Sequence, residues 1–384
     1  MASLLIAVIY ISFISLGLPD SLLGSAWPIM YQEFNVPLSY SGIIFFIISA
    51  ATVFTSLEAD RIIKKFGTGK IVAVSVTMTA LSLIGFSISK SFIALCFLAL
   101  PYGLGAGSID VALNNYVALH YESRHMSWLH CMWGLGCSVG PYIMSYGITA
   151  TSSWNMGYFI TGLIQLVFSV IVIMSLPLWK DNKNNKEDIK EEPTPLKDVL
   201  KIPGAPQILI SFFCYCAIEQ TVGLWASSYL VLHSHLDEAL ASGFASLFYV
   251  GITIGRAING FLTYKLSDSK LIYSGLGIIF AGVLLMMFNI SSITSLIGFS
   301  LIGLGCAPIY PCIIHSTPVY FGEKNSQAMI GVQMASAYAG TALMPPVFGI
   351  IARSISVSLL PYYLLIFLVL EYLTFKVVDK MHSK

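Results

Sequence analysis

The sequence predicts an all-α integral membrane protein, with twelve transmembrane helices arranged in two pseudo-symmetric six-helix bundles. Three features lead to this expectation: the composition, the spacing of apolar windows, and a repeat between the two halves. The chain of 384 residues is 56% hydrophobic and 10% charged, whereas soluble domains carry about 25% charged residues. So little charge cannot cover a surface in water, but it suits a chain whose solvent is the lipid bilayer.

Windows of about 20 apolar residues, long enough to cross the hydrocarbon core, recur along the chain. The first lacks the basic start and the small-residue cleavage site of a secretory signal, so we expect it to be retained as a helix. The predicted spans are residues 3–30, 39–58, 70–88, 91–119, 127–150, 155–178, 206–231, 240–262, 271–289, 293–317, 327–351 and 356–376.

A hydrophilic segment separates the sixth window from the seventh. It runs from Lys180 to Gly204 and is dense in charges of both signs, as is typical of a solvated linker. We therefore expect an N-terminal bundle over 1–179, a cytoplasmic linker over 180–204 and a C-terminal bundle over 205–384.

The distribution of basic residues predicts the orientation. When both termini are placed in the cytoplasm, the inner loops hold 17 of the 20 lysines and arginines. The exceptions are Lys90, Arg353 and Arg256. Lys90 and Arg353 fall in outer loops, and Arg256 lies near the inner end of the eighth helix. The sequence thus predicts a multi-pass protein of the cell membrane (inner or plasma membrane) with both termini cytoplasmic.

The two halves also repeat each other. Four short segments of the first half match segments of the second half in the same order and at a nearly constant separation, which is typical of parallel repeats about an axis along the membrane normal. The matched pairs are 64–72 with 264–272, 103–110 with 303–310, 20–24 with 219–223, and 136–141 with 340–345.

Polar residues interrupt the apolar fourth window. Gly103, Gly107, Asp110 and Asn114 are spaced by four, three and four residues, so they form one stripe along a helix. The glycines allow a neighbouring helix to approach closely. We expect Asp110 and Asn114 to face the protein interior or a water-filled cavity, while Asn115 points about 100° away around the helix.

Two further carboxylates lie deep in apolar windows: Asp20 in the first, and Glu219 at the matching place in the seventh. Acids inside the membrane are expensive and are functional by default. Because burial favours the neutral form of a carboxyl group, such acids can bind and release protons. We therefore predict that Asp20, Asp110 and Glu219 couple transport to protons. The alternative is that each acid is a neutral, hydrogen-bonded group that only fixes helix packing.

Several other side chains are candidates for substrate binding. Amides, a histidine and carboxylates can hydrogen-bond the hydroxyls of a sugar, and aromatic rings can stack on its apolar face, although aromatic residues at helical spacing also serve packing. The candidates are Asn114, Asn115, His130, Trp133, Gln220, Trp225, Tyr310, His315, Gln333 and Tyr338.

Several motifs resemble a known family. The helix number, the central linker and "EADRIIKKFGTGK" resemble the major facilitator superfamily, although Ser56 stands where its signature usually has glycine. Five segments resemble, more narrowly, its fucose–galactose–glucose proton symporter family, over about residues 16 to 346. They are "GAGSIDVALNNYV", "MSWLHCMWGLGCSVGP", "AIEQTVGLWASSYLV", "YVGITIGRAINGF" and "SLIGLGCAPIYP".

That resemblance implies roles for particular residues. Asp20 and Asp110 match the acids that serve coupling and sugar binding in the family's fucose permease, with aspartate at Asp110 where glutamate is more usual. "DVALN" matches its "ETAAN"-like motif, so Asn114 is implied as well. Trp133 stands in place of a sugar-contacting asparagine, which leaves the sugar open. "AIEQ" matches the "GIET"-like segment of the glucose/mannose symporters at Glu219.

The favoured hypothesis is a secondary transporter, a proton-coupled monosaccharide symporter working by alternating access between two bundles. The alternatives are a proton-coupled exporter of drugs or metabolites and a sodium-coupled sugar symporter, since an Asp/Asn cluster can hold a hard cation. A membrane enzyme or sensor is disfavoured because no HExxH or P-loop motif is present.

The expected partners are few. We predict a small-molecule substrate, a sugar in the favoured hypothesis, together with a coupling ion and the lipid bilayer around a monomer. A net charge of +1 does not suggest binding to nucleic acid. Seven cysteines lie in apolar windows, and we expect free thiols with no disulfide, no metal site and no cofactor.

Overall fold

In the computed structural model, the described residues are 2–121, 123–179, 200–263, 265–288 and 291–382. Some side chains inside these ranges, including that of Asn115, lie outside the description. The described chain consists of helices and connecting turns, without a β-strand. The all-α fold class predicted from the sequence is confirmed.

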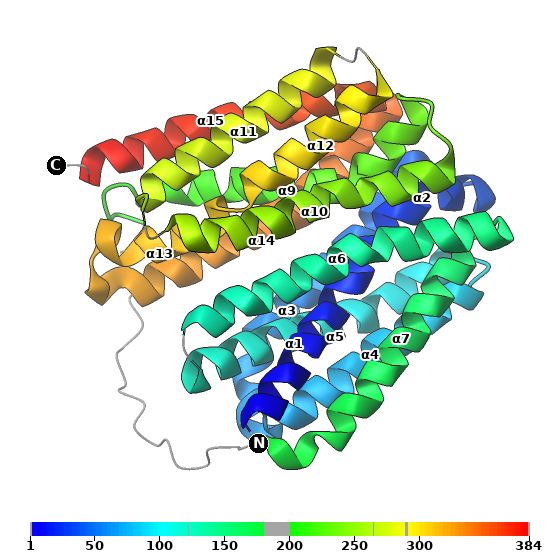
Figure 1. Cartoon of the computed structure of the whole chain (residues 1–384), viewed down its shortest axis with the longest axis horizontal. Helices are drawn as coiled ribbons and strands as arrows, with labels where there is room; N and C mark the ends of the chain where they lie inside the picture. The colour runs from blue at the N-terminus through cyan, green and yellow to red at the C-terminus, as the bar shows by residue number, and fades with distance from the viewer. Residues whose placement is uncertain (1, 122, 180–199, 264, 289–290, 383–384) are drawn as a thin grey trace.

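The helices before the predicted linker begin close to the N-terminus and alternate with short loops (Figure 1). They are α1 (Ala2–Asp20), α2 (Leu22–Glu33), η1 (Leu38–Tyr40), α3 (Ser41–Phe66), α4 (Thr68–Ile88), α5 (Phe92–His120), α6 (Ser123–Thr151), α7 (Trp154–Met174) and η2 (Leu176–Leu178).

The helices after it follow the same plan. They are α9 (Ala205–Leu232), α10 (Glu238–Leu262), α11 (Asp268–Phe288), α12 (Ser292–Cys306), α13 (Ile309–Phe321), α14 (Glu323–Ser354), η3 (Val357–Leu359) and α15 (Leu360–His382). Residues 180–199 of the predicted linker lie outside the described residues, so the domain boundaries stay a prediction.

Each predicted span coincides with one helix or with two consecutive helices. Eleven segments of the described chain are long and apolar enough to cross a membrane. The remaining helix, α6, is long enough at 29 residues but contains polar residues, among them His125 and His130. The protein is therefore a multi-pass membrane protein.

Two predicted spans are broken in the middle. The first divides into α1 and α2 at Ser21, two residues after Pro19, and another divides into α12 and α13 around Pro308. Proline has no N–H to donate, so the carbonyl four residues earlier loses its helical partner. At the first break, Gln165 of α7 donates to the freed carbonyl of Ser15. Irregular backbone at membrane depth is tolerated where protein supplies such partners.

Figure 1 draws two groups of helices, α1 to α7 and α9 to α15, that converge near α2 and diverge toward the end where both termini lie. The contacts between the groups are made by α6 with α10, α3 with α14 and α2 with α9. At the converging end, Ser227 Oγ donates to the carbonyl of Ser25 at 3.4 Å, and Ser242 Oγ donates to that of Pro141 at 3.3 Å.

A glycine permits the close approach of α2 to α9. A Cβ atom added to Gly24 of α2 would lie 2.6 Å from the carbonyl oxygen of Gly223 on α9. No larger residue fits there without moving a helix. Small residues at a helix crossing are a standard way to bring two backbones together in membrane proteins. We refer to this region, where α2 meets α9 and α6 meets α10, as the seal.

Candidate functional site

A cavity of about 530 Å³ lies between the two groups of helices. Helices from both groups line it, namely α1, α2, α3, α5 and α6 from the first and α9, α10, α13 and α14 from the second. Its volume falls within the range of about 300–1,000 Å³ that is usual for small-molecule sites. A site shared by both groups changes shape whenever one group moves relative to the other.

The three carboxylates that were predicted from the sequence, Asp20, Asp110 and Glu219, all line this cavity. They come from α1, α5 and α9, so two belong to the first group of helices and one to the second. The chain thus brings together acids that are almost 200 residues apart in sequence, and their proposed role in proton coupling is addressed below.

Asp20 lies at the last position of α1, where the helix breaks. Its two oxygens accept hydrogen bonds from different helices: Oδ1 from the hydroxyl of Tyr102 at 3.1 Å, and Oδ2 from the indole Nε1 of Trp133 at 2.8 Å. The helix break therefore places the carboxylate where α5 and α6 can both reach it. Trp133 positions Asp20 directly, in addition to lining the cavity.

A cation completes the centre of the site. The guanidinium of Arg256, on α10, lies 5.1 Å from the centre of the Trp133 ring and 3.6 Å from Oε1 of Glu219. The Arg256 and Glu219 side chains are 13% and 7% exposed, so water screens this pair weakly. The four side chains Asp20, Trp133, Arg256 and Glu219 form a continuous chain of contacts from α1 to α9, which we call the central chain.

Asp110 belongs to a separate cluster on α5. The amide of Asn114 donates to Oδ1 of Asp110 at 2.9 Å and to its backbone carbonyl at 3.0 Å. Asn114 is not among the cavity-lining residues, so it acts on the cavity through Asp110. The four-residue spacing that was predicted to align these two groups does so.

Five other candidates line the cavity: His130, Gln220, Tyr310, His315 and Tyr338. The ring of His130 packs edge-on against Phe13, with ring centres 5.7 Å apart. Tyr310 lies just after the break between α12 and α13, and its hydroxyl donates to Sδ of Met334 at 3.2 Å.

His315 lies at one edge of the cavity. Its Nδ1 is 2.7 Å from Oδ2 of Asp268, at the start of α11, and its side chain is 81% exposed. Helix α13, which carries His315, and the start of α11, which carries Asp268, lie at the end of the molecule where the two groups of helices diverge. It is therefore better placed to line the cavity entrance than its centre.

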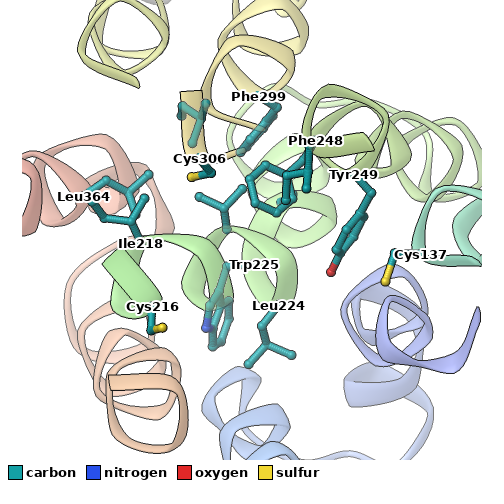
Figure 2. Close-up of a cluster of buried hydrophobic side chains, with 14 of the residues drawn as sticks. Cys137, Cys216, Ile218, Leu224, Trp225, Phe248, Tyr249, Phe299, Cys306 and Leu364 are labelled. Carbon is teal, nitrogen blue, oxygen red and sulfur yellow. The ribbon is translucent and has the colours of Figure 1, made fainter. Parts of the chain in front are cut away.

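The structure places two candidates away from the cavity. Trp225 is completely buried among apolar side chains (Figure 2), and its Nε1 donates to the carbonyl of Pro345 at 2.9 Å. Gln333 is also fully buried and accepts a hydrogen bond from Thr317 at 3.0 Å. Each faces the packed side of its helix, so the geometry assigns both to helix packing. The side chain of Asn115 lies outside the description.

Sequence reasoning did not select two residues of the site, Arg256 and Tyr102. Arg256 was treated only as a loop-proximal charge, although an arginine within an apolar window is itself a signal for a functional site. Tyr102 carries no such signal, because a tyrosine in a transmembrane helix is common. Only the packing of α5 against α1 reveals its contact with Asp20.

No group of three or more histidine, cysteine or acidic side chains within the described ranges could hold a metal ion. The seven cysteines are free thiols, and five of them are buried. The polar groups of the cavity include carboxylates, one guanidinium, aromatic and aliphatic hydroxyls, an indole, an amide, a thiol and imidazoles. This set can bind a polar small molecule and exchange protons.

Comparison with known proteins identifies the family. The sequence description of the Major Facilitator Superfamily matches residues 9–288 and 233–380. The chain belongs to this superfamily. Its members are transporters, so the protein is a transporter and not an enzyme.

Relatives in the superfamily include sugar transporters. The chain is 26% identical to the glucose/mannose transporter GlcP of Bacillus subtilis, over 88% of this chain and 86% of that protein. It is 24% identical to bypass of stop codon protein 6 of Saccharomyces cerevisiae, over 91% of this chain and 77% of that protein. The human sodium-dependent glucose transporter 1 is 21% identical, over 88% and 72%.

Proposed function

We propose that the protein is a proton-coupled symporter of a monosaccharide that works by alternating access. The observation that carries this proposal is the placement of Asp20, Asp110 and Glu219 around one cavity between the two groups of helices. Relatives named as glucose transporters support a sugar as the substrate. The cavity supplies both kinds of contact that a sugar needs, hydrogen-bonding groups and aromatic rings.

The central chain suggests how a proton and a sugar are coupled. Glu219 has a cation beside it, whereas the oxygens of Asp20 and Asp110 accept hydrogen bonds only from neutral groups among the described contacts. An ionised acid without a cation is costly to enclose when both sides of the cavity are closed. Protonation of Asp20 or Asp110 removes that cost, so the loaded carrier can reorient, and loss of the proton on the other side favours release.

The conformation fits an inward-facing carrier. The seal closes the converging end, while the cavity includes His315 near the diverging end, where both termini lie. With the termini in the cytoplasm of the cell, as the distribution of basic residues favours, the cavity opens inward and the seal lies on the outer side. The proposed carrier is a monomer in the cell membrane.

Uptake by purified protein in liposomes tests the role of Asp110. An imposed inward proton gradient should drive accumulation of a radiolabelled monosaccharide by the native protein. Asp110→Asn keeps the shape of the side chain but cannot ionise, so accumulation should fall to the equilibrium level while exchange of internal for external sugar continues. The matched control is Glu238→Gln, which removes a carboxylate at the start of α10, outside the cavity.

Gradient-dependent accumulation by Asp110→Asn protein would remove Asp110 from coupling. Replacing sodium by choline in the same assay distinguishes the ions, since uptake that needs sodium and ignores the proton gradient would favour a sodium-coupled symporter. If no monosaccharide from a panel binds, and cells expressing the protein resist toxic compounds, the exporter hypothesis replaces the symporter.

A further inference from the structure

The interior of the second group of helices contains a carboxyl group outside the cavity. Glu371 lies on α15, and its side chain is completely buried. Neither carboxyl oxygen has a hydrogen-bond partner among the described residues. An ionised carboxylate there would be an uncompensated charge in apolar surroundings, which is far costlier than a neutral acid. Glu371 is therefore protonated in this conformation.

Glu371 lies close behind the wall of the cavity. Helix α15 packs along α9, the helix that carries Glu219. The thiols of Cys216 and Cys306 are each within electrostatic range of both Glu219 and Glu371. Figure 2 shows these two cysteines in one buried cluster with Leu364 of α15, and Cys216 also lines the cavity. Helix α15 thus packs against the helix that contributes Cys216 and Glu219 to the cavity wall.

The titratable groups within electrostatic range of Glu371 include three thiols. Cys214 and Cys216 approach from α9, and Cys306 approaches from α12. On α11, which also packs against α15, Tyr273 is directed about two turns further along α15, where its hydroxyl donates to Asp379. In the described part of the chain, no lysine, arginine or histidine forms an ion pair with Glu371.

Charge balance links the two acids. Arg256 provides one positive charge in this region, and Glu219 lies 3.6 Å from it. Since a second negative charge would be unpaired and would repel Glu219 through a poorly screening interior, Glu371 holds its proton as long as Glu219 is ionised. Neutralising Glu219, or admitting water beside Cys216, lowers the cost of ionising Glu371.

We propose that Glu371 is a second proton-binding site of the transporter, which exchanges its proton with water in the cavity as α9 moves during the transport cycle. In this step the O–H bond of the acid breaks, the proton passes to a water molecule and the electron pair stays on the carboxylate; reloading is the reverse. The inference rests on the proposed proton-coupled transport and adds a site that the cavity itself does not contain.

Infrared difference spectroscopy of the purified protein tests whether Glu371 binds a proton, and it does so without measuring transport. A protonated carboxyl group has its own C=O stretching band. The native protein should show such a band in alkaline buffer, where exposed acids are ionised, and the band should be missing from Glu371→Gln. Glu238→Gln, the control variant, should retain it. Addition of a transported sugar should shift the band in the native protein.

Uptake in liposomes tests the link to transport. Glutamine resembles the protonated acid but cannot release a proton, so Glu371→Gln protein should move fewer protons per sugar than the native protein, measured from internal acidification and uptake of labelled sugar in the same liposomes. Glu371→Met, an apolar side chain of similar length, also cannot ionise and should show the same lower ratio of protons to sugar. Two different replacements separate the loss of the proton site from a general loss of folding.

Both the infrared and the uptake experiment can overturn the proposal. An infrared band that is absent, that remains in Glu371→Gln, or that ignores both pH and sugar would overturn the proposal and leave Glu371 as a fixed structural acid. An unchanged ratio of protons to sugar in both variants would do the same. If the band behaves as expected but sugar moves no protons in the native protein, the proton site stands and the proposed coupling to sugar fails.

Discussion

Arg256 connects the two halves of the cavity through two different interactions. Its guanidinium lies over the ring of Trp133 on α6 and beside the carboxylate of Glu219 on α9. The planar guanidinium can stack and pair at once, which a lysine ammonium cannot do in the same geometry. Since Trp133 also donates to Asp20, a change at Glu219 can be transmitted to Asp20 through contacts alone.

A double-mutant cycle measures how strongly Arg256 and Glu219 depend on each other. Arg256→Gln leaves Glu219 as an unpaired charge in a poorly hydrated site, and we expect it to lower the free energy of unfolding by about 3 kcal/mol. Adding Glu219→Gln removes that charge and should restore most of the loss. Thermal unfolding in detergent gives both values. A double variant as unstable as the single one would show that the pair is not coupled.

Broken helices place two of the cavity residues. Asp20 is the last residue of α1, and Tyr310 is the second residue of α13, so both side chains emerge where the regular backbone is interrupted. The first break follows Pro19 and the second includes Pro308; the missing N–H groups of these prolines release carbonyls from the helical ladder. A continuous helix would direct the same side chains according to its regular turn and would hold them more rigidly.

Helix α2 provides a test of the seal at the level of one element. Gly24→Leu adds a side chain where even a Cβ atom would lie 2.6 Å from the carbonyl oxygen of Gly223. Overpacking of this kind costs about 1–3 kcal/mol, which shifts a two-state equilibrium by roughly 5- to 150-fold. We expect the seal to open, so that a thiol reagent applied from outside labels a cysteine introduced at Leu23 faster.

The control for the Gly24→Leu experiment is the same substitution at Gly277. Gly277 on α11 has open space around its Cα, so Gly277→Leu adds the same bulk without touching the seal. The control should label at the native rate. Equal labelling in Gly24→Leu and native protein would mean that this crossing does not keep the outer side closed.

The whole molecule consists of two groups of helices that meet at one end and diverge at the other. Contacts between the two groups are made at α2 with α9, α3 with α14 and α6 with α10, and Figure 1 shows the groups diverging away from this seal. Rocking about the cavity would exchange the closed and open ends, as proposed for alternating access. Because the carboxylates line the cavity between the groups, such a motion would expose them to water from one side at a time.

A covalent link across the seal tests this motion directly. Ser227 Oγ lies 3.4 Å from the carbonyl of Ser25, so cysteines at these two positions can be joined by an oxidant or a short thiol cross-linker. In a background without the native cysteines, we expect cross-linking to abolish uptake of sugar while binding from the inner side remains. Where the link is a disulfide, a reductant should break it and restore uptake. Undiminished transport by fully linked protein would exclude opening of the seal.

Much of the architecture could be predicted from the order of residues. Bilayer thickness sets the length of each apolar window. The helices, and the number of times that the chain crosses the membrane, therefore follow from composition and spacing. Acids in such windows are conspicuous, and Asp20, Asp110 and Glu219 were selected on that ground. The positions of the breaks after Pro19 and around Pro308 were missed because a short interruption hardly changes the hydropathy of a window.

Only the tertiary structure decided which polar and aromatic side chains face the cavity. Trp225 follows Glu219 closely on α9, yet one side chain faces the core and the other the cavity, because a helix distributes neighbours around its axis. The partnership of Arg256 with Trp133 and Glu219, and the isolation of Glu371, depend on contacts between helices far apart in the chain. The sequence by itself determined the solvent, the helices and the rare charges, since these depend on local composition; which charges meet depends on how the helices pack.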